Sequence, residues 1–238
     1  YWRPYRRCQK TQIQKSIFHL LSILMIDHKQ TNKLCLRWKG KQRRIGITGG
    51  IASGKTIVGN FLFQAKKWPI LDSDLYAHEA LKLNSSISRK VLLRFGDQIV
   101  QQTTISSKAI NRKALAKIIF KNDIEKEWLE GIIHPFVNKR IEEELEKFQL
   151  NAVILLIIPL LFEKNYTNLC SEVCYIDCSR AMQLKRLQSR DKLSLEEANQ
   201  RIDAQWDSSL KKPFADNIIT NSNNDEKWKM QLKKLYNF

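Results

Sequence analysis

Apolar residues in this chain follow two alternating patterns, short runs of strand length and residues spaced three or four apart. Apolar runs occupy Ala152–Ile158 and Val173–Asp177, and a shorter β-compatible stretch spans Arg44–Thr48. A continuous run with β-branched residues is typical of a parallel strand that is buried on both faces. Helical spacing in Thr56–Lys66 and Met182–Asp191 predicts helices between such strands. The alternation predicts an α/β fold with a central parallel sheet between layers of helices.

Shorter patterned segments complete this outline. Short strands are expected at Pro69–Leu71 and Asp216–Thr220. Ser194 and Glu197 form the Ser-x-x-Glu pattern of a capping box, which predicts the start of a helix. The further helices are expected at Leu75–Leu83, from Ser194 to Gln205, and at Asp225–Tyr236.

The stretch from about residue 84 to residue 150 predicts helices without an intervening strand. Ser107 is a suitable N-cap for the second of them. Pro135 suits the first position of the fourth, where its missing N–H costs nothing. We therefore expect a helical insertion between two strands of the sheet. Its helices are expected at Asn84–Phe95, Ser107–Phe120, Asp123–Leu129 and His134–Leu150.

Charge is distributed unevenly along the 238 residues, whose formal net charge is +17. Residues 1–44 hold 12 basic side chains against Asp27 alone, and the remaining residues hold 29 basic and 23 acidic side chains. A modest positive excess in that larger part suits an enzyme with polyanionic substrates. Residues 1–43 are expected to be a basic extension outside the fold, either an organelle presequence or a translated leader. The folded domain is expected to span residues 44–238.

Cysteine usage and hydropathy favour a cytoplasmic protein. No stretch reaches 18 apolar residues, so no membrane span is predicted. The cysteines are odd in number and their spacing matches no zinc pattern, which favours reduced thiols that pack in the interior. They are Cys8, Cys35, Cys170, Cys174 and Cys178. We expect a monomer or a weak homo-oligomer.

The segment Gly49–Thr56 carries the most specific pattern in the chain. It has the form G-x-x-x-x-G-K-[ST], and it lies between a predicted strand and a predicted helix. In this context glycine-rich backbone N–H groups surround a phosphate, and the helix N-terminus adds partial positive charge. Lys55 is expected to reach the β- and γ-phosphates, and the Thr56 hydroxyl to bind Mg²⁺. The loop alone predicts a nucleoside triphosphate, without distinguishing a kinase, a GTPase or a motor.

Two carboxylates follow the second predicted strand. Asp72 and Asp74 lie one residue apart where that strand ends, and the carboxyl ends of parallel strands border the ligand crevice. One of them can support a Mg²⁺-bound water or accept a proton from an acceptor hydroxyl. Asp74 is equally suited to cap the following helix. His134 likewise has an alternative role as a cap or a packing residue.

A basic helix and its successor have the character of a lid. Arg186 and Arg190 are four residues apart, so they share a helix face and are suited to bind phosphates. The alternative is an exposed helix with solvated arginines. Two helices joined by a polar turn, with arginines facing inward, are typical of a mobile lid over a phosphoryl-transfer site. We expect this lid at about residues 180–212.

From Arg44 to its end, the chain resembles the dephospho-CoA kinase family. The Pro-Leu-Leu-Phe-Glu stretch and the His-Pro pair are specific to that family rather than general to phosphate-binding loops. The motifs occur in the family's order. They are Thr48–Thr56, Leu71–Asp74, Asn111–Leu115, Ile133–Pro135, Ile158–Glu163, Tyr175–Ser179 and Gln183–Asp191.

The resemblance implies a P-loop NTPase fold of the nucleotide-kinase type, with a helical acceptor-binding insertion and a helical lid. It implies ATP-dependent phosphorylation of the ribose 3′-hydroxyl of dephospho-CoA, the final step of coenzyme A synthesis, with Mg²⁺. Asp74 would be the base or orient the acceptor, Asp72 would support metal and water, and Arg112 and His134 would lie toward the acceptor. The residues implied for ATP are Ala52, Ser53, Gly54, Lys55, Thr56 and Ile57, with Arg186 and Arg190 from the lid.

Two loop positions depart from the family pattern. Ala52 replaces a usual glycine and Ile57 replaces a second hydroxyl residue. If position 52 needs a positive φ, ATP affinity should suffer. The rival functions are another small-molecule kinase, a GTP-binding switch and a basic nucleic-acid-binding protein. A GTP-binding switch needs a guanine-specific Asn-Lys-x-Asp motif, and Asn138–Ile141 lacks the aspartate, so GTP is not an expected ligand. The excess of basic residues lies at one end of the chain, so nucleic acid is not an expected partner either.

Overall fold

The computed structural model describes residues 34–104, 107–119, 121–222 and 226–238. Its centre is a sheet of five parallel strands in the order β2-β5-β1-β6-β7. Strand β1 lies in the middle, so Ile47 is paired with Ile157 on one side and Cys174 on the other. The predicted parallel sheet is therefore confirmed. Its strands are β1 (Arg43–Gly49), β2 (Ile70–Asp72), β5 (Val153–Ile157), β6 (Glu172–Asp177) and β7 (Asn217–Thr220).

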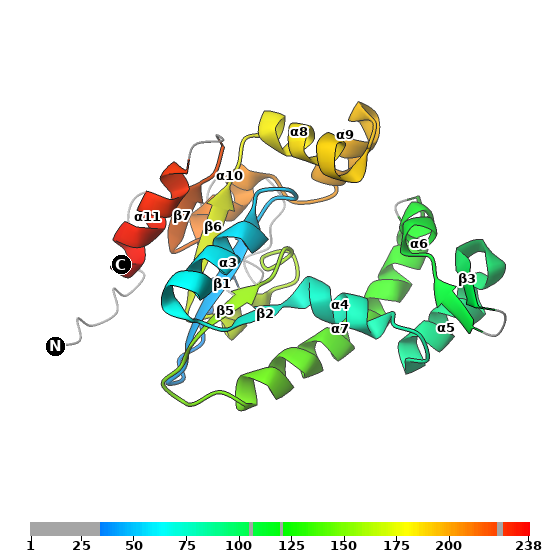
Figure 1. Ribbon diagram of the computed structural model, residues 1–238, viewed down its shortest axis with the longest axis horizontal. Coiled ribbons are helices and arrows are strands. Elements are labelled where there is room, and N and C mark those ends of the chain that lie inside the picture. Colours follow the sequence, from blue (N-terminus) through cyan, green and yellow to red (C-terminus); the bar gives the residue numbers. More distant parts are fainter. Residues whose placement is uncertain (1–33, 105–106, 120, 223–225) are drawn as a thin grey trace.

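Both faces of this sheet are covered, which explains its continuous apolar runs. Helices α3 (Lys55–Lys66) and α11 (Lys227–Tyr236) pack on one face, where Leu155 contributes to a core with Val58 and Trp228. The neighbouring residue Leu156 points to the opposite face, because side chains alternate along a strand. Figure 1 shows α11 beside β7 and α3 over β1.

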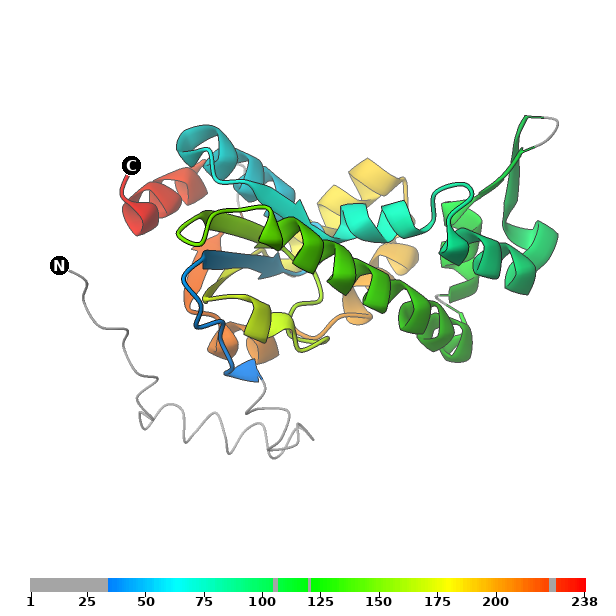
Figure 2. The ribbon, with the colours of Figure 1, turned by 90° about the horizontal axis from the view of Figure 1, so that it is seen from below.

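The insertion between β2 and β5 extends away from the sheet and has a core of its own (Figures 1 and 2). Val91 and Ile99 are fully buried in this second core, and Leu115 is 3% exposed. A separate core allows the insertion to hold a fixed shape at a distance from the sheet. Its elements are α4 (Ser73–Ala80), α5 (Ser86–Phe95), the 3₁₀ turn η1 (Gly96–Ile99), β3 (Val100–Thr104), β4 (Ser107–Ile110), α6 (Arg112–Ile119) and α7 (Asp123–Glu146).

Two predictions about the insertion are wrong. The segment from Ser107 begins with an antiparallel hairpin of β3 and β4 rather than with a helix. Helix α6 starts only at Arg112, where the Asn111 side chain accepts hydrogen bonds from the N–H groups of Lys113 and Ala114. Asn111, rather than Ser107, therefore caps this helix. The insertion contains a hairpin as well as helices.

The two helices expected at Asp123–Leu129 and His134–Leu150 form the single helix α7, with Pro135 inside it. An interior proline costs about 3 kcal/mol because it removes a hydrogen bond and crowds the preceding turn. Packing on both sides of Pro135 offsets this cost. Leu129 contacts the insertion core, and Ile141 and Leu145 lie in the core under the sheet. Helix α7 thereby joins the two cores.

Strand β6 leads into the helices expected to form the lid, α8 (Arg180–Asp191) and α9 (Leu195–Asp203). The Ser179 hydroxyl caps α8 by accepting from the Met182 N–H, and the predicted capping box of Ser194 and Glu197 opens α9. Both helices stand over the end of the sheet where α3 begins (Figure 1). The short helix α10 (Ser208–Lys211) and the 3₁₀ turn η3 (Lys212–Phe214) return the chain to β7, and a further 3₁₀ turn, η2 (Tyr166–Leu169), precedes β6.

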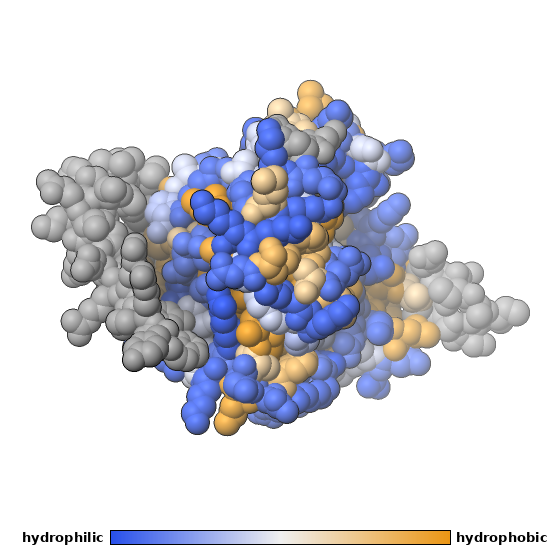
Figure 3. Space-filling view, turned by 60° about the vertical axis from the view of Figure 1, so that its left-hand side comes forward, coloured by the Kyte–Doolittle hydropathy of each residue, from blue (hydrophilic) through white to orange (hydrophobic). Residues whose placement is uncertain are grey.

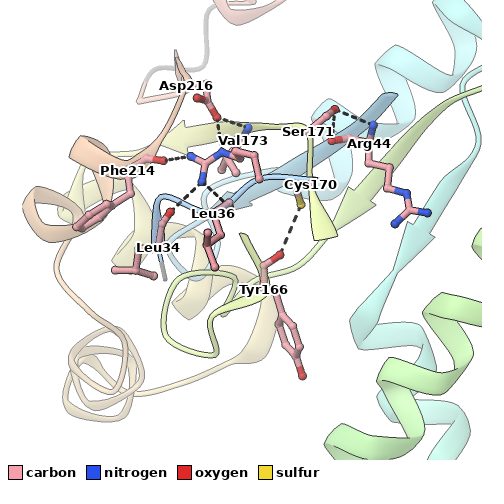
Figure 4. Close-up of polar contacts among 10 residues, drawn as sticks. Leu34, Leu36, Arg44, Tyr166, Cys170, Ser171, Val173, Phe214 and Asp216 are labelled. Atoms are coloured by element: carbon pink, nitrogen blue, oxygen red, sulfur yellow. Dashed lines mark hydrogen bonds and ion pairs between the residues drawn. The ribbon is translucent and has the colours of Figure 1, made fainter. Parts of the chain in front are cut away.

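The segment 34–43 packs against the domain, which corrects the expected start of the fold at residue 44. Leu34 is fully buried under the sheet. Arg37 forms an ion pair of 3.0 Å with Asp216 and donates to the Phe214 carbonyl oxygen, and Leu34, Phe214 and Asp216 converge there in Figure 4. Arg37, a basic residue of this segment, is therefore paired with groups of the folded domain. The rest of the predicted extension, residues 1–33, lies outside the described residues.

Cys170, Cys174 and Cys178 are free thiols and are buried, as predicted; Cys8 lies outside the described residues. Within the part of the chain that the structure describes, no helix has the length and hydropathy needed to cross a membrane. The face drawn in Figure 3 is largely hydrophilic, with hydrophobic residues in small patches and a strip near the middle of the view.

Candidate functional site: a phosphate-binding loop beneath a helical lid

The loop between β1 and α3 has the backbone geometry that a phosphate site needs. Gly49 has φ 151° and Gly54 has φ 99°. A Cβ on Gly49 would lie 2.4 Å from the Ile176 carbonyl oxygen, so the loop can pass β6 only with glycine there. Gly54 is the N-cap of α3 and provides no side-chain hydrogen bond. The first N–H groups of α3 are therefore left for an anion.

Ala52 has the left-handed conformation, with φ 56°. This answers the question raised by the sequence, because the position does need a positive φ and an alanine supplies it. A non-glycine residue in this region costs about 1 kcal/mol. Ser53 next to it is 1% exposed, and its hydroxyl is a buried polar atom without a hydrogen-bond partner among the described residues.

Lys55 lies at the start of α3 and its ammonium is turned back onto the loop. Nζ donates to the carbonyl oxygens of Gly49 at 3.0 Å and Gly50 at 2.9 Å. Desolvation lowers the pKa of Lys55 to about 8, although the charge of Asp74 opposes this shift. Buried Lys211 lowers the pKa further. An anion bound in the loop would favour the charged form of Lys55.

The two acids after β2 have different roles. The Asp72 side chain accepts a hydrogen bond of 2.9 Å from the Asp74 N–H, so Asp72 is the cap of α4. Desolvation raises the pKa of Asp72, and the hydrogen bond from Asp74 lowers it to a smaller extent. Asp74 lies in the first turn of α4 and is exposed. Its charge is the largest of those that raise the pKa of Lys55, so the Asp74 carboxylate is in electrostatic range of the loop ammonium.

Arg186 of α8 lies on the loop. Its Nη1 donates to the carbonyl oxygens of Ala52 at 3.2 Å and Ser53 at 3.3 Å, and its Nη2 donates to the Asn221 carbonyl oxygen. The alternative of a solvated arginine therefore does not apply to Arg186. The Asn221 side chain also donates to the Ser53 carbonyl oxygen, at 2.8 Å.

Arg190 is held differently from Arg186. Its guanidinium makes two hydrogen bonds to the neighbouring Asp191, of 2.8 and 2.9 Å, and its side chain is 62% exposed. These bonds raise the pKa of Arg190, and the charge of Asp74 adds to the effect. Arg190 is therefore paired with Asp191 and lies in electrostatic range of Asp74, whereas the hydrogen bonds to the loop itself belong to Arg186.

The remaining predicted site residues lie on α3, α6 and α7. Thr56 is exposed in the first turn of α3, and Ile57 beside it is 59% exposed. Arg112 is exposed at the start of α6. His134 is half-buried on α7, where burial and the charge of Lys164 lower its pKa and keep it neutral at pH 7.

Three polar residues that the sequence did not identify as site residues contribute to the loop's surroundings. Gln183 and Gln205 from the lid bind the peptide groups of Ile51, and Asn221 binds that of Ser53. Their partners are backbone atoms of a distant segment, so no local pattern reveals them. A polar cavity of about 270 Å³ borders this region, lined by Gly50 and Tyr175 among others.

A buried ion pair lies behind the loop. Lys211 is fully buried and its Nζ is 2.5 Å from Glu163. Glu163 also accepts a hydrogen bond from the Trp206 N–H, so it joins the loop after β5 to the segment between α9 and α10. Glu163 belongs to the Ile158–Glu163 motif, one of those that carry the family resemblance. Its partners, Lys211 and the Trp206 N–H, lie where the lid joins the rest of the domain.

Comparisons with known proteins identify the family of this chain. The family model described as dephospho-CoA kinase matches residues 43–227. A protein named dephospho-CoA kinase from Prochlorococcus marinus strain NATL2A is 75% identical over 214 residues, covering 90% of this chain and 100% of that protein. One of the same name from Trichormus variabilis is 40% identical, covering 83% and 98%. The match of 214 residues is longer than residues 44–238, so part of the predicted extension, residues 1–43, has a counterpart in this relative.

Solved structures show the same arrangement. A Thermus thermophilus protein superposes with a TM-score of 0.69 at 28% identity, covering 82% of this chain and 96% of that one. Dephospho-CoA kinase from Campylobacter jejuni superposes with a TM-score of 0.60 at 31% identity, with the same coverage. These likenesses bear out the P-loop kinase fold with its central parallel sheet. By its family match, its relatives and its fold, the chain belongs to the dephospho-CoA kinase family.

Proposed function

We propose that this protein transfers the γ-phosphoryl group of ATP to the ribose 3′-hydroxyl of dephospho-CoA and so forms coenzyme A. The observation that carries the proposal is the phosphate-binding loop with Lys55 Nζ turned onto it, near enough to Asp74 for the charge of that carboxylate to act on the pKa of Lys55. We propose that Asp74 orients a hydroxyl and that Lys55 binds the transferred phosphoryl group. In-line transfer needs these two functions on opposite sides of the reacting phosphorus.

The loop binds the phosphates of ATP. The N–H groups at the start of α3 and the ammonium of Lys55 supply donors and positive charge. In the described structure Lys55 donates to two carbonyl oxygens of the loop, and we propose that it exchanges these for phosphate oxygens. Arg186 is already fixed against the loop carbonyls, so its guanidinium is pre-organised to stabilise charge on the transferred group.

The acceptor lies between the insertion and the lid. Asp74 stands at the start of α4, and Arg190 of the lid is in electrostatic range of it. We propose that Asp74 orients the attacking hydroxyl and takes its proton, because Asp72 is occupied as the α4 cap. Arg112 and His134, on the insertion, remain proposed acceptor contacts.

The residues present fit a magnesium ion bound together with ATP. No cluster of three His, Cys, Asp or Glu side chains that could hold a metal occurs among the described residues, and Mg²⁺ in such sites keeps waters and phosphate oxygens as most of its ligands. Thr56 would supply a hydroxyl ligand and Asp72 would accept from a metal-bound water. The raised pKa of Asp72 shows a carboxylate that a nearby cation would stabilise. Bound Mg²⁺ would neutralise charge on the β- and γ-phosphates.

The free thiols of Cys170, Cys174 and Cys178 suit a cytoplasmic enzyme, and we propose that location. A monomer or weak homo-oligomer stays a prediction, as does the absence of a nucleic-acid partner.

The experiment is a phosphorylation assay on the full chain with ATP and Mg²⁺. Dephospho-CoA is compared with a panel of nucleosides and nucleotides, and the product is identified by mass and by its 3′-phosphate. We expect phosphorylation of dephospho-CoA with at least a hundredfold preference over the panel, on the order of what a site built to bind one acceptor gives. Turnover of a nucleoside with dephospho-CoA left unmodified would reject the proposal in favour of another small-molecule kinase.

A further inference from the structure

The peptide groups of Ile51, inside the phosphate-binding loop, are held from both sides by the lid. The Ile51 N–H donates to Gln205 Oε1 at 2.8 Å. The Ile51 carbonyl oxygen accepts from Gln183 Nε2, also at 2.8 Å. Gln183 comes from α8 and Gln205 from the segment that follows α9, so two parts of the lid each contribute one side chain.

Both glutamines are fixed in place. Gln183 is 8% exposed, and a Cβ added to Gly50 would lie only 2.3 Å from its Nε2, so the loop and α8 are in close contact. Gln205 is followed by Trp206, whose N–H donates to Glu163, and Glu163 is in turn paired with buried Lys211. Gln205 is therefore anchored through the buried ion pair rather than only through α9.

These contacts lie next to the part of the loop whose amides are expected to bind phosphate. Ile51 directly precedes Ala52, which has the left-handed conformation, and the loop amides that follow must keep one orientation to bind a phosphate together. Arg186 fixes the carbonyl oxygens of Ala52 and Ser53. The loop is thus bound by lid side chains at three consecutive residues.

We infer that Gln183 and Gln205 are positioning residues for phosphoryl transfer: together they clamp the peptide groups of Ile51 and hold the phosphate-binding loop in the shape that binds ATP. The inference rests on the proposed use of ATP and adds a role for two residues that have no part in the chemistry. Neither residue contacts the acid pair or Lys55 in the described structure. Their effect is on ATP binding, through the backbone.

The test replaces each glutamine with methionine, which matches glutamine in length but lacks its amide. ATP affinity is measured by direct titration without acceptor, alongside kcat and the KM for dephospho-CoA. Removal of one hydrogen bond that leaves a half-buried peptide group unpaired should weaken ATP binding about tenfold in Gln183→Met and in Gln205→Met. The KM for dephospho-CoA should change less than twofold. Gln200→Met is the matched control, because Gln200 is exposed on α9 and its side chain donates to Glu196 rather than to the loop.

The double variant distinguishes a clamp from two independent contacts. The two bonds hold neighbouring peptide groups of one residue, so breaking either lets the backbone rotate and removes most of the value of the other. We expect the double variant to bind ATP about ten- to twentyfold more weakly than the wild type, whereas independent contacts would multiply to about a hundredfold.

Unchanged ATP affinity in the single variants, a multiplicative loss in the double variant, or an equal loss in Gln200→Met would each overturn the inference. Circular dichroism and thermal unfolding confirm that the variants are folded, and methionine is chosen because volume-conserving changes are tolerated best. A wild-type protein that binds ATP without phosphorylating dephospho-CoA would contradict the proposed function. In that case the ATP titrations of the glutamine variants would still test the inference about Gln183 and Gln205. A wild type that does not bind ATP would overturn both.

Discussion

The side chain of Asp72 accepts a hydrogen bond from the backbone N–H of Asp74, at 2.9 Å. This contact gives different roles to two acids that lie one residue apart. Asp72 is used by the backbone as the cap of α4, while no hydrogen bond or ion pair engages the Asp74 carboxylate within the described residues. The carboxylate that remains for an acceptor hydroxyl is therefore that of Asp74.

Replacing Asp74 by asparagine should lower kcat by a factor on the order of 10² to 10⁴, the range that a positioned proton acceptor contributes. Asparagine keeps the size of the side chain but cannot take a proton. ATP affinity, measured by titration, should change less than threefold, because the phosphate donors are unaltered. Asp123→Asn is the control, since Asp123 occupies an equivalent first-turn position on α7. Unchanged turnover in Asp74→Asn would remove Asp74 from the mechanism.

The lowered pKa of Lys55 predicts how ATP binding depends on pH. In the nucleotide-free protein this pKa is about 8, so the ammonium loses its proton as pH rises from 7 to 9. ATP affinity should fall over this range, and ATP binding near pH 8 should take up a fraction of a proton. Calorimetry in buffers of different ionisation enthalpy measures that uptake. Lys55→Met should bind ATP more weakly and without proton uptake; uptake equal to that of the wild type would contradict the assignment.

The lowered pKa of Lys55 also determines how the free energy of unfolding changes with pH. The folded pKa of Lys55 lies below its unfolded value, so burying the charged form opposes folding, and this cost is fully present below about pH 8. Between pH 8 and 10.5 the unfolded chain binds more protons at this group than the folded chain. The contribution of Lys55 to the free energy of unfolding should therefore rise with pH across that window, and denaturant titrations of wild type and Lys55→Met should converge there.

Ala52→Gly should increase the free energy of unfolding by about 1 kcal/mol, because glycine adopts a left-handed backbone without strain. For a chain of this size this corresponds to a rise of about 2–4 °C in Tm. ATP affinity should change less than threefold, since Ala52 already has φ 56° without nucleotide. Lys67→Gly, at another left-handed position outside the loop, should give a similar gain in stability. A tenfold gain in ATP affinity from Ala52→Gly alone would show that the free loop abandons this conformation.

Removal of residues 1–43 should destabilise the domain, whereas removal of residues 1–33 keeps every described contact of the segment that begins at Leu34. The longer truncation loses the buried Leu34 side chain, worth about 2–5 kcal/mol in a core, and the ion pair of Arg37 with Asp216. Thermal unfolding of the two truncations should differ by several degrees or more. Arg37→Ala should lower stability by about 1–3 kcal/mol through its lost hydrogen bonds to the Phe214 carbonyl oxygen and Asp216. Equal Tm values for the two truncations would show that this packing adds nothing.

The sequence determined the features that depend on local spacing. The runs at β1, β5 and β6 predicted buried parallel strands because both faces of each strand are covered. The glycines at 49 and 54 and Lys55 predicted the loop, since its shape depends on backbone conformation and helix polarity over eight residues. The capping box at Ser194 likewise depends on four consecutive residues, and the structure contains it.

Only the tertiary structure decided what depends on distant partners. Pro135 lies inside α7 because two separate cores hold the helix on either side of it, and Ser107 begins a strand because its hairpin partner is available. The same holds for the site. Which acid caps α4, which arginine rests on the loop, and that two lid glutamines hold Ile51 all depend on backbone groups many residues away. Local patterns fix what a segment can form, and long-range packing and hydrogen bonds select among those forms.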